Sequence, residues 1–520
     1  MLNVFSIVLM LAACHATSAF AQVLNASACA CLEGLGADIG ISGDVQYSAS
    51  TVSAHALNLT GVEGTNDIGI CRIEGSIAYG AEKNNTLHFE VWLPESSAYN
   101  GRYLSVGNGG FAGVIDYSAM ITNLNSGYAV GGGDSGHSTS QNGPTRPGGY
   151  VDFMNNEDET RAWIQNSIAM FTDPSKKLTT AYYQEPPKKM YYAGCSTGGA
   201  QGFALAQYHP EIFDGIFAGS PGNWYSHLIL SFLWNGMNSN DTDSFMDQQA
   251  LDFIKEAVLS ECDAIDGVTD GLIENPENCD FDISSLQCPS DQQPVVDNTT
   301  ICLTSAQIDN AKLFYAGPTN NDTGASIYPG FALGSEAEWM PQESSLWIEY
   351  GIPILQNLVF KNLSYDYTQF NWASDVDLVD QMASPLIDEI SANLTGFQQR
   401  GGKLIVTQGW ADPYNAPTWP IEHRGQMQEV FGEELDDFFG LFMVPGGGHC
   451  SGAESYPQMP GTWHALEALV SWVEEDSFPE AILASDPADG SNSTRKLCPY
   501  PQNAVYLGGD VGDWESYTCQ

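Results

Sequence analysis

The sequence predicts an α/β fold in which a mostly parallel sheet carries helices on both faces and a large segment is inserted. Three observations lead to this expectation. Short apolar, β-like runs alternate with helix-like segments up to residue 222 and again after residue 396. One of these runs passes through a glycine-flanked serine directly into a helix-like segment. Between the two regions the alternation is lost, which indicates an insertion and not more sheet.

The core elements can be placed in order along the chain. Apolar strand-like runs and turn signals before the insertion predict strands at 87–93, 102–107, 188–194 and 213–222, a glycine-rich loop at 107–113, and a helix at 198–210 that stops at Pro210. After the insertion, the same signals predict a strand and loop at 401–413, a helix at 419–432, a strand at 438–450 and an amphipathic helix at 464–475.

The middle of the chain differs from both ends in composition and in hydrophobic periodicity. From about 223 to 395 it holds many Asn-x-Ser/Thr sequons, almost no basic residues and only weak periodicity. We therefore expect residues 223–395 to form a lid domain. Residues 22–222 and 396–520 would together form the catalytic domain.

The beginning of the chain is typical of a secreted protein. Residues 1–21 are an apolar run that ends in Ala19-Phe20-Ala21, which predicts a signal peptide and a mature chain from Gln22. A membrane anchor is the alternative, but the run is short for one. A set of sequons predicts an extracellular glycoprotein; its asparagines are Asn25, Asn58, Asn84, Asn240, Asn298, Asn321, Asn362, Asn393 and Asn492.

The charge balance excludes two classes of partner. The chain carries 17 basic and 64 acidic residues, a formal net charge of −47. Such a chain repels nucleic acid and anionic membranes. The sequence defines no oligomeric state.

The cysteines predict disulfides and not a zinc site. There are 12 in the chain, of which Cys14 belongs to the predicted signal peptide, and none forms a C-x-x-C pair. The remaining cysteines would make five pairs with one thiol left over, either Cys29 or Cys31.

Three residues in the core regions have the order and setting of a catalytic triad. Ser196 lies in Gly194-Cys195-Ser196-Thr197-Gly198, which fits the G-x-S-x-G nucleophile elbow between a strand and a helix. Asp412 follows the predicted strand KLIVTQ, and His449 follows LFMVP through three glycines. The order Ser, acid, His, each after a strand, is that of α/β-hydrolases, so we expect an α/β-hydrolase core with a serine esterase triad. A glycine-rich turn and a simple turn aspartate are the alternatives for Ser196 and Asp412.

Two cysteines flank the predicted triad. Cys195 immediately precedes Ser196, and Cys450 immediately follows His449. A disulfide between them would tie together two catalytic residues that are far apart in sequence.

At this point the chain resembles the tannase/feruloyl esterase family of secreted esterases. The resemblance is carried by the stretches NGRYLSVGNGGFAG, GYAVGGGDSGH, YYAGCSTGGAQG, FDGIFAGSPGN, GGKLIVTQGWADP, VPGGGHC and KLCPYPQNAVYLGGDV. It implies the triad Ser196, Asp412 and His449 with the flanking cysteines bridged. It also implies an oxyanion hole formed by the backbone N–H groups of Thr197 and Gly110, since acyl transfer needs two preorganised donors.

Other cysteine pairs follow from the resemblance and from proximity in sequence. These are Cys262–Cys279, Cys288–Cys302, Cys498–Cys519, and Cys71 with Cys29 or Cys31. This chain departs from the family pattern at three positions. Ala200, Gln408 and Tyr99 stand where the family commonly has an arginine, a histidine and a tryptophan, respectively.

A second candidate site lies in the predicted lid. Asp263, Asp266 and Asp270 crowd together in CDAIDGVTDGLIE (262–274), and a hard cation such as calcium would neutralise them. Two solvated Asp-Gly turns are the alternative. The resemblance implies a structural calcium ion that is bound by these aspartates and by the backbone oxygens of Val268 and Leu272. No organic cofactor is expected.

The sequence therefore predicts a secreted hydrolase of phenolic esters, with feruloyl (hydroxycinnamoyl) esters of plant cell-wall polysaccharide as the first choice of substrate. A tannase acting on galloyl esters is the nearest alternative. A serine peptidase and a catalytically inactive glycan-binding protein are more distant ones. Lid aromatics would shape the acyl site, and the candidates are Trp234, Phe331, Trp339, Trp347, Tyr350 and Trp372. Asp134-Ser135-Gly136-His137 is interpreted as structural, because one triad already accounts for the chemistry.

Overall fold

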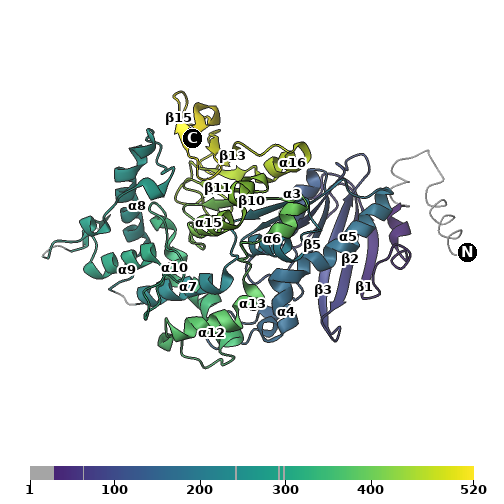
Figure 1. Ribbon diagram of the computed structural model, residues 1–520, viewed down its shortest axis with the longest axis horizontal. Helices are drawn as coiled ribbons and strands as arrows, with labels where there is room; N and C mark the ends of the chain where they lie inside the picture. Colours follow the sequence, from purple (N-terminus) through teal and green to yellow (C-terminus); the bar gives the residue numbers. More distant parts are fainter. Residues whose placement is uncertain (1–27, 63, 241–242, 291–292, 297–298) are drawn as a thin grey trace, which may run out of the picture.

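The computed structural model describes residues 28–62, 64–240, 243–290, 293–296 and 299–520. Its centre is a nine-stranded sheet in the order β1-β2-β3-β5-β4-β6-β7-β10-β11 (Figure 1). The strands are β1 (Val45–Val52), β2 (Ile70–Tyr79), β3 (Asn85–Pro94), β4 (Arg102–Val106), β5 (Ala129–Gly133), β6 (Lys189–Cys195), β7 (Gly215–Gly219), β10 (Lys403–Gly409) and β11 (Phe439–Val444). The predicted signal peptide 1–21, Gln22 and the sequons at Asn25 and Asn298 lie outside the described residues.

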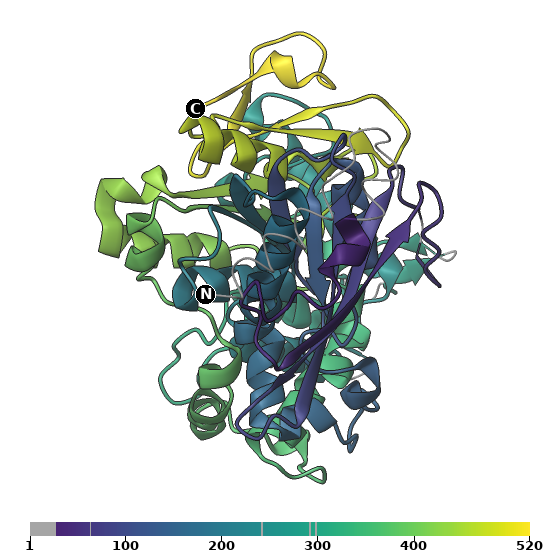
Figure 2. The same ribbon diagram turned by 90° about the vertical axis from the view of Figure 1, so that its right-hand side faces the viewer.

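Strand direction divides this sheet into two parts. β1, β2, β3 and β5 pair antiparallel, and they form the edge that faces the viewer in Figure 2. β5, β4, β6, β7, β10 and β11 all pair parallel. The prediction of an α/β fold with a mostly parallel sheet is confirmed. The elbow serine follows β6, in the middle of the parallel part.

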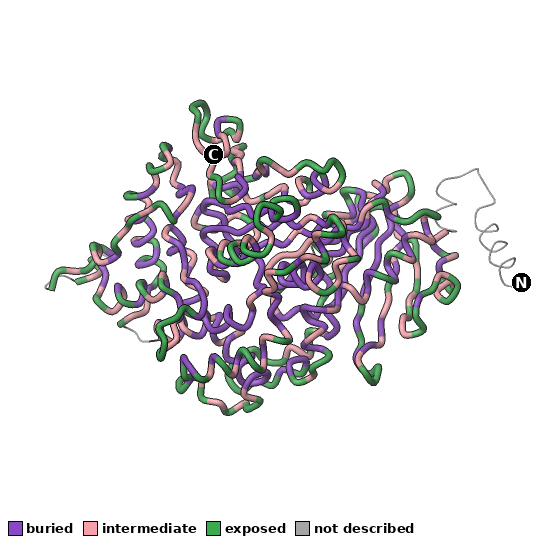
Figure 3. The backbone as a smooth tube through the Cα atoms, viewed as in Figure 1, coloured by how far each residue is buried: buried purple, intermediate pink, exposed green. Residues whose placement is uncertain are grey.

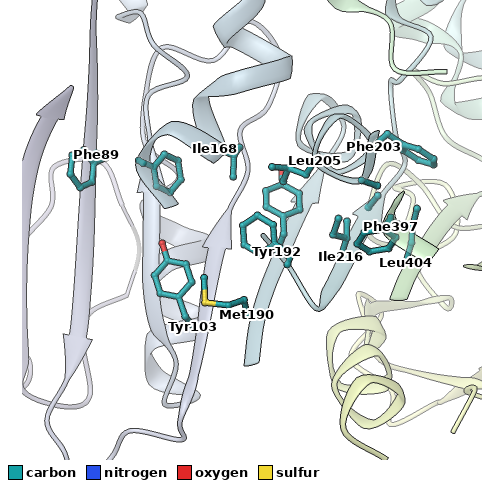
Figure 4. Close-up of a cluster of buried hydrophobic side chains, with 14 of the residues drawn as sticks. Phe89, Tyr103, Ile168, Met190, Tyr192, Phe203, Leu205, Ile216, Phe397 and Leu404 are labelled. Atoms are coloured by element: carbon teal, nitrogen blue, oxygen red, sulfur yellow. The ribbon is translucent and has the colours of Figure 1, made fainter. Parts of the chain in front are cut away.

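Side chains alternate along the central strands and so build two separate cores. Tyr103, Tyr192 and Leu404 belong to one core, whereas their neighbours Leu104, Tyr191 and Ile405 belong to the other. Figure 4 shows part of the first core, in which strand residues such as Ile216 lie against helix residues such as Phe203 and Leu205. Because successive strand residues point to opposite faces, a run of apolar residues buries both faces.

Helices cover each face of the sheet. Helices α5 (Ser167–Tyr183), α6 (Thr197–Tyr208) and α15 (Trp419–Phe431) contribute to the first core, and α3 (Tyr117–Asn125) and α16 (Ala465–Glu475) contribute to the second. The short α4 (Glu157–Arg161) precedes α5. The predicted helices at 198–210, 419–432 and 464–475 correspond to α6, α15 and α16.

The segment between β7 and β10 leaves the sheet and is mostly helical. Its elements are α7 (Tyr225–Ser239), α8 (Gln248–Cys262), β8 (Val295–Val296), β9 (Thr299–Thr300), α9 (Ser305–Ala316), α10 (Met340–Ser344), the π-helical turn η8 (Trp347–Gly351), α11 (Ile352–Ile354), the π-helical turn η9 (Leu355–Val359), α12 (Ser374–Met382), α13 (Ser384–Ile387) and α14 (Thr395–Gln399). We refer to residues 220–402 as the inserted segment. The predicted lid, 223–395, lies within it, and its status as a separate domain stays a prediction.

The inserted segment has one core of its own and shares another with the catalytic region. Ile254 and Phe314 belong to a cluster that is confined to the insertion. In a second cluster, Leu233 and Trp347 of the insertion pack with Ala204 of α6. In Figure 3, buried residues accordingly continue from the catalytic region into the inserted segment.

The last residues form small sheets beside β11. The strands are β12 (Pro460–Trp463), β13 (Ile482–Pro487), β14 (Arg495–Leu497), β15 (Ala504–Tyr506) and β16 (Tyr517–Cys519). Among the described residues, no helix combines the length and the apolar character needed to cross a bilayer.

Five disulfides are present among the described residues. They are Cys29–Cys71, Cys195–Cys450, Cys262–Cys279, Cys288–Cys302 and Cys498–Cys519. The alternative left open for Cys71 is thus resolved in favour of Cys29. The expectation of one leftover thiol is wrong for the described part of the chain. No cysteine there is free, because Cys31 is disulfide-bonded as well.

Candidate active site

Ser196 lies on a sharp turn between β6 and α6. Its backbone has φ 63° and ψ −119°, a strained conformation for a residue with a side chain. Glycines make the turn possible: a Cβ at Gly194 would lie 2.6 Å from the Gly198 carbonyl oxygen, and one at Gly198 would lie 3.0 Å from the Asn108 carbonyl oxygen. The Ser196 N–H donates to the Gly219 carbonyl at 2.9 Å, which fixes the turn against β7. The predicted elbow has the required geometry.

Asp412 and His449 are joined by a hydrogen bond at the ends of β10 and β11. The Nδ1 of His449 lies 2.8 Å from one carboxylate oxygen of Asp412 and 3.0 Å from the other. Asp412 is fully buried and also accepts hydrogen bonds from the Tyr414 and Asn415 N–H groups. Burial alone would raise the pKa of Asp412, but His449 and these N–H donors lower it overall. The carboxylate is therefore kept ionised and fixes the orientation of the imidazole ring.

Ser196 and His449 line the same cavity, between the catalytic region and the inserted segment. The cavity has a volume of about 660 Å³. Its catalytic-region wall includes the loop Asn108–Gly110, and its other wall is largely apolar. The apolar and aromatic residues on that wall are Tyr225, Leu228, Phe232, Leu346 and Tyr350. A cavity of this size and character suits a small aromatic ligand.

The loop that carries Gly110 is held rigidly beside Ser196. The Gly109 carbonyl accepts from the Ala112 N–H at 2.9 Å, and the Gly110 carbonyl accepts from the Thr197 hydroxyl at 2.9 Å. The Trp163 indole donates to the same Gly110 carbonyl at 3.0 Å. No acceptor for the N–H of Thr197 or of Gly110 is found among the described residues. One of these unused donors belongs to Gly110, which lines the cavity, and the other to the residue directly after Ser196; an oxyanion hole requires two such donors.

The cysteines that flank Ser196 and His449 are bonded to each other, with their Cα atoms 6.1 Å apart. A ring nitrogen of His449 lies within 4.8 Å of both sulfur atoms. The disulfide therefore connects the end of β6 to the loop after β11 directly beside Ser196 and His449.

The acidic stretch in the insertion has a neutralising base that sequence analysis missed. Arg495, only 2% exposed, donates to the Asp270 carboxylate at 2.6 Å and to Glu274 at 2.8 Å. Asp263 accepts from the Asp270 and Gly271 N–H groups. The scarcity of basic residues in 223–395 therefore does not leave this stretch without a base, because Arg495 reaches it from β14, far away in sequence. One oxygen of Asp266 is still buried without a hydrogen-bond partner.

The Asp134–His137 motif contacts the loop that carries Gly110 from the side away from the cavity. His137 Nε2 lies 2.8 Å from the Phe111 carbonyl oxygen, and the ring stacks on Phe153. The Ser135 hydroxyl donates to the Asn108 side chain at 2.7 Å. Burial lowers the pKa of His137 to about 4, so its ring is neutral. These contacts fit the structural role expected for the motif.

Sequence analysis also missed a partner of Asp412. The Gln408 side-chain amide donates to Asp412 at 2.9 Å. In the sequence, Gln408 stands out only as a departure from the family pattern. Of the six lid aromatics singled out in the sequence, Tyr350 alone is among the residues that line the cavity. Trp339, for example, stacks on Phe314, and Trp234 packs on Trp372.

Known proteins resemble this chain over most of its length. The sequence profile described as "Tannase and feruloyl esterase" matches residues 71–520. Feruloyl esterase B from Aspergillus niger is 31% identical over 477 residues, which cover 87% of each chain. An uncharacterised esterase from Xanthomonas campestris pv. campestris is 31% identical over 505 residues, which cover 86% of this chain and 84% of the relative.

Among solved structures, feruloyl esterase B from Aspergillus oryzae superposes with a TM-score of 0.84 at 26% identity. The match covers 95% of this chain and 100% of that chain.

Proposed function

Because this chain belongs to the tannase and feruloyl esterase family, we propose that it is a serine carboxylesterase that hydrolyses phenolic esters. The observation that carries the proposal is the buried Asp412 bonded to His449, beside the elbow serine in one cavity. The catalytic roles of Ser196, Asp412 and His449 are part of this proposal.

The proposed reaction uses the groups that line this cavity and the carboxylate behind His449. His449 Nε2 takes the proton from the Ser196 hydroxyl as the oxygen attacks the ester carbonyl. The oxyanion accepts hydrogen bonds from the Thr197 and Gly110 N–H groups. His449 then protonates the leaving alcohol, and water hydrolyses the acyl-enzyme by the same route. Asp412 holds the Nδ1–H tautomer and stabilises the imidazolium ion.

Feruloyl esters are the proposed acyl substrates, with the alcohol on a plant cell-wall polysaccharide. The relatives named feruloyl esterase B and the apolar wall of the cavity support this choice. A galloyl group brings three hydroxyls, and burying these against apolar side chains is costly. Galloyl esters remain the second candidate, because the family also includes tannases.

A panel of methyl ferulate, caffeate, sinapate and gallate tests the acyl preference. We expect kcat/KM for methyl ferulate to exceed that for methyl gallate by at least about tenfold, the effect of about 1.4 kcal/mol of differential binding. 4-Nitrophenyl acetate serves as a control for general esterase activity. A preference for methyl gallate would instead make the chain a tannase, and hydrolysis of the acetate alone would exclude a phenolic esterase.

We also propose that the insertion binds a structural calcium ion through Asp263, Asp266 and Asp270 and the backbone oxygens of Val268 and Leu272. One oxygen of Asp266 supports it: that oxygen is buried without a hydrogen bond, with Arg495 at 4.0 Å, and carboxylate and carbonyl oxygens are the ligands that calcium prefers. Arg495 shares Asp270, so a net negative site remains.

Removal of calcium should lower the melting temperature by a few degrees. A ligand present at 100 times its Kd stabilises the folded state by about 2.7 kcal/mol. Added calcium, but not magnesium, should restore the melting temperature. Asp266→Asn should lose this response, whereas Asp309→Asn, at an exposed acid on α9, should keep it. Purified protein with no calcium by elemental analysis would contradict the proposal.

Secretion and glycosylation complete the proposed function. The sequon asparagines within the described residues are all exposed and so open to modification; they are Asn58, Asn84, Asn240, Asn321, Asn362, Asn393 and Asn492. Five disulfides fit an oxidising compartment. Treatment of the secreted protein with an endoglycosidase should reduce its apparent mass.

A further inference from the structure

Tyr350 brings a hydroxyl group from the inserted segment to the loop Asn108–Gly110, which we call the oxyanion loop. It is the fourth residue of η8 and lines the cavity together with Ser196. A Cβ placed on Gly110 would lie 3.0 Å from the Tyr350 hydroxyl oxygen. Any larger residue at position 110 would therefore push against this hydroxyl. The glycine leaves the tyrosine room to approach the loop.

The Tyr350 ring is held in place on two sides. Its centroid lies 4.8 Å from that of Phe111 and 6.2 Å from that of Phe232, both in edge-to-face arrangements. Phe111 directly follows Gly110, so the same packing couples the ring to the loop. The aromatic ring is thus positioned by residues from both sides of the cavity.

The hydroxyl itself is not used elsewhere. No hydrogen-bond partner for it is found among the described residues, whereas the hydroxyl of Tyr365, also in the inserted segment, donates to Asp375. Burial, together with Glu349 and Tyr414, raises the pKa of Tyr350, which keeps the hydroxyl protonated. It is a neutral donor that faces the catalytic cavity.

Covalent geometry limits how far this donor can be from the Gly110 N–H. The Gly110 nitrogen lies about 2.5 Å from the Cβ position, so the Tyr350 oxygen lies within about 5.5 Å of that nitrogen. Two donors can share one oxygen acceptor at up to about 5.6 Å from each other, because N–H···O and O–H···O bonds span about 2.9 and 2.7 Å. This limit is compatible with an oxyanion that lies between the two groups and accepts from both.

We propose that Tyr350 donates a third hydrogen bond to the oxyanion, beside the N–H groups of Thr197 and Gly110. This role rests on the proposed function. As the Ser196 oxygen bonds to the carbonyl carbon, the π electrons of the carbonyl move to its oxygen and the serine proton moves to His449. Tyr350 keeps its own proton and stabilises the negative oxygen until the alcohol leaves. The inserted segment then contributes directly to catalysis as well as to substrate binding.

The test is Tyr350→Phe, which removes the hydroxyl and keeps the ring packing. Loss of one oxyanion donor lowers kcat by about 100- to 1000-fold in a two-donor site. For a third donor we expect a loss of about 10- to 100-fold, with KM changed less than about threefold. The loss should be equal for methyl ferulate and for 4-nitrophenyl acetate, because both form the same oxyanion. Tyr365→Phe, which removes a hydroxyl elsewhere in the insertion, should leave kcat unchanged.

The other outcomes overturn the proposal. A loss confined to methyl ferulate would mean that Tyr350 contacts the aromatic acyl group, and a rise in KM alone would mean ground-state binding. Unchanged kinetics would remove the hydroxyl from catalysis. A lowered melting temperature in Tyr350→Phe but not in Tyr365→Phe would point to a structural defect. If the parent protein cleaves only the acetate, the phenolic substrate is wrong, but the effect of Tyr350 can still be measured.

Discussion

Ser196→Ala should fold as the parent protein does and lose essentially all ester turnover. No hydrogen bond of the Ser196 side chain to another described residue contributes to the fold, and alanine can take the same backbone conformation at a similar cost. Without the hydroxyl no acyl-enzyme can form. In a comparable triad, loss of the serine lowers kcat by about 10⁶-fold, and binding and the oxyanion hole supply what remains.

The measurement is kcat with 4-nitrophenyl acetate and methyl ferulate, alongside thermal unfolding. Ser451→Ala is the matched control, because Ser451 is an exposed serine two residues after His449. It should retain the activity of the parent. Activity of Ser196→Ala within tenfold of the parent would remove Ser196 from the mechanism.

Local sequence signals were enough to predict most of the parallel sheet. The runs 190–193 around Tyr191 and 404–406 around Ile405 contain only apolar and aromatic residues, as expected for strands buried on both faces. β5 could not be found in this way. Its sequence AVGGG has three glycines and little β propensity. Side chains from neighbouring elements pack directly against these glycines. A Cβ at Gly131, for example, would lie 2.1 Å from the Tyr103 hydroxyl.

The residues of the candidate site also fall into two groups, those with a local sequence signal and those without one. Ser196, Asp412 and His449 lie at or within a few residues of the ends of β6, β10 and β11, so their order along the chain is informative. Tyr350 and Arg495 reach their partners across 240 and 225 residues, respectively, and only the packing of the insertion and of the last strands brings them there. A residue of this kind has no local signal.

Removal of the disulfide Cys195–Cys450 should lower both the stability of the protein and its kcat. Cys195→Ala/Cys450→Ala should fold, unfold at a lower temperature, and show a kcat at least about tenfold below that of the parent. The bridge closes a loop of 255 residues. The chain-entropy model gives about 5 kcal/mol for such a loop, an upper bound because Cys262–Cys279 and Cys288–Cys302 already shorten it.

The loss of kcat has a separate cause from the loss of stability. Ser196 and Cys450 both have φ 63°, a region that costs a residue with a side chain about 1 kcal/mol or more. The disulfide connects these two strained turns. Without it, Cys450 can relax toward an ordinary conformation and take the neighbouring His449 with it. The proton transfer from Ser196 tolerates little displacement of the imidazole, whereas the apolar wall that binds substrate lies in the insertion and should change less.

A remote disulfide separates the two effects. Cys288→Ala/Cys302→Ala removes a bridge of the inserted segment that closes 14 residues, away from the cavity. It should lower the melting temperature and leave kcat unchanged, whereas the Cys195/Cys450 variant should lower both, with KM changed less than kcat. Non-reducing peptide maps of the parent provide the prior check. If Cys195 and Cys450 are found as free thiols or with other partners, or if the two double variants lose kcat equally, the bridge does not position His449.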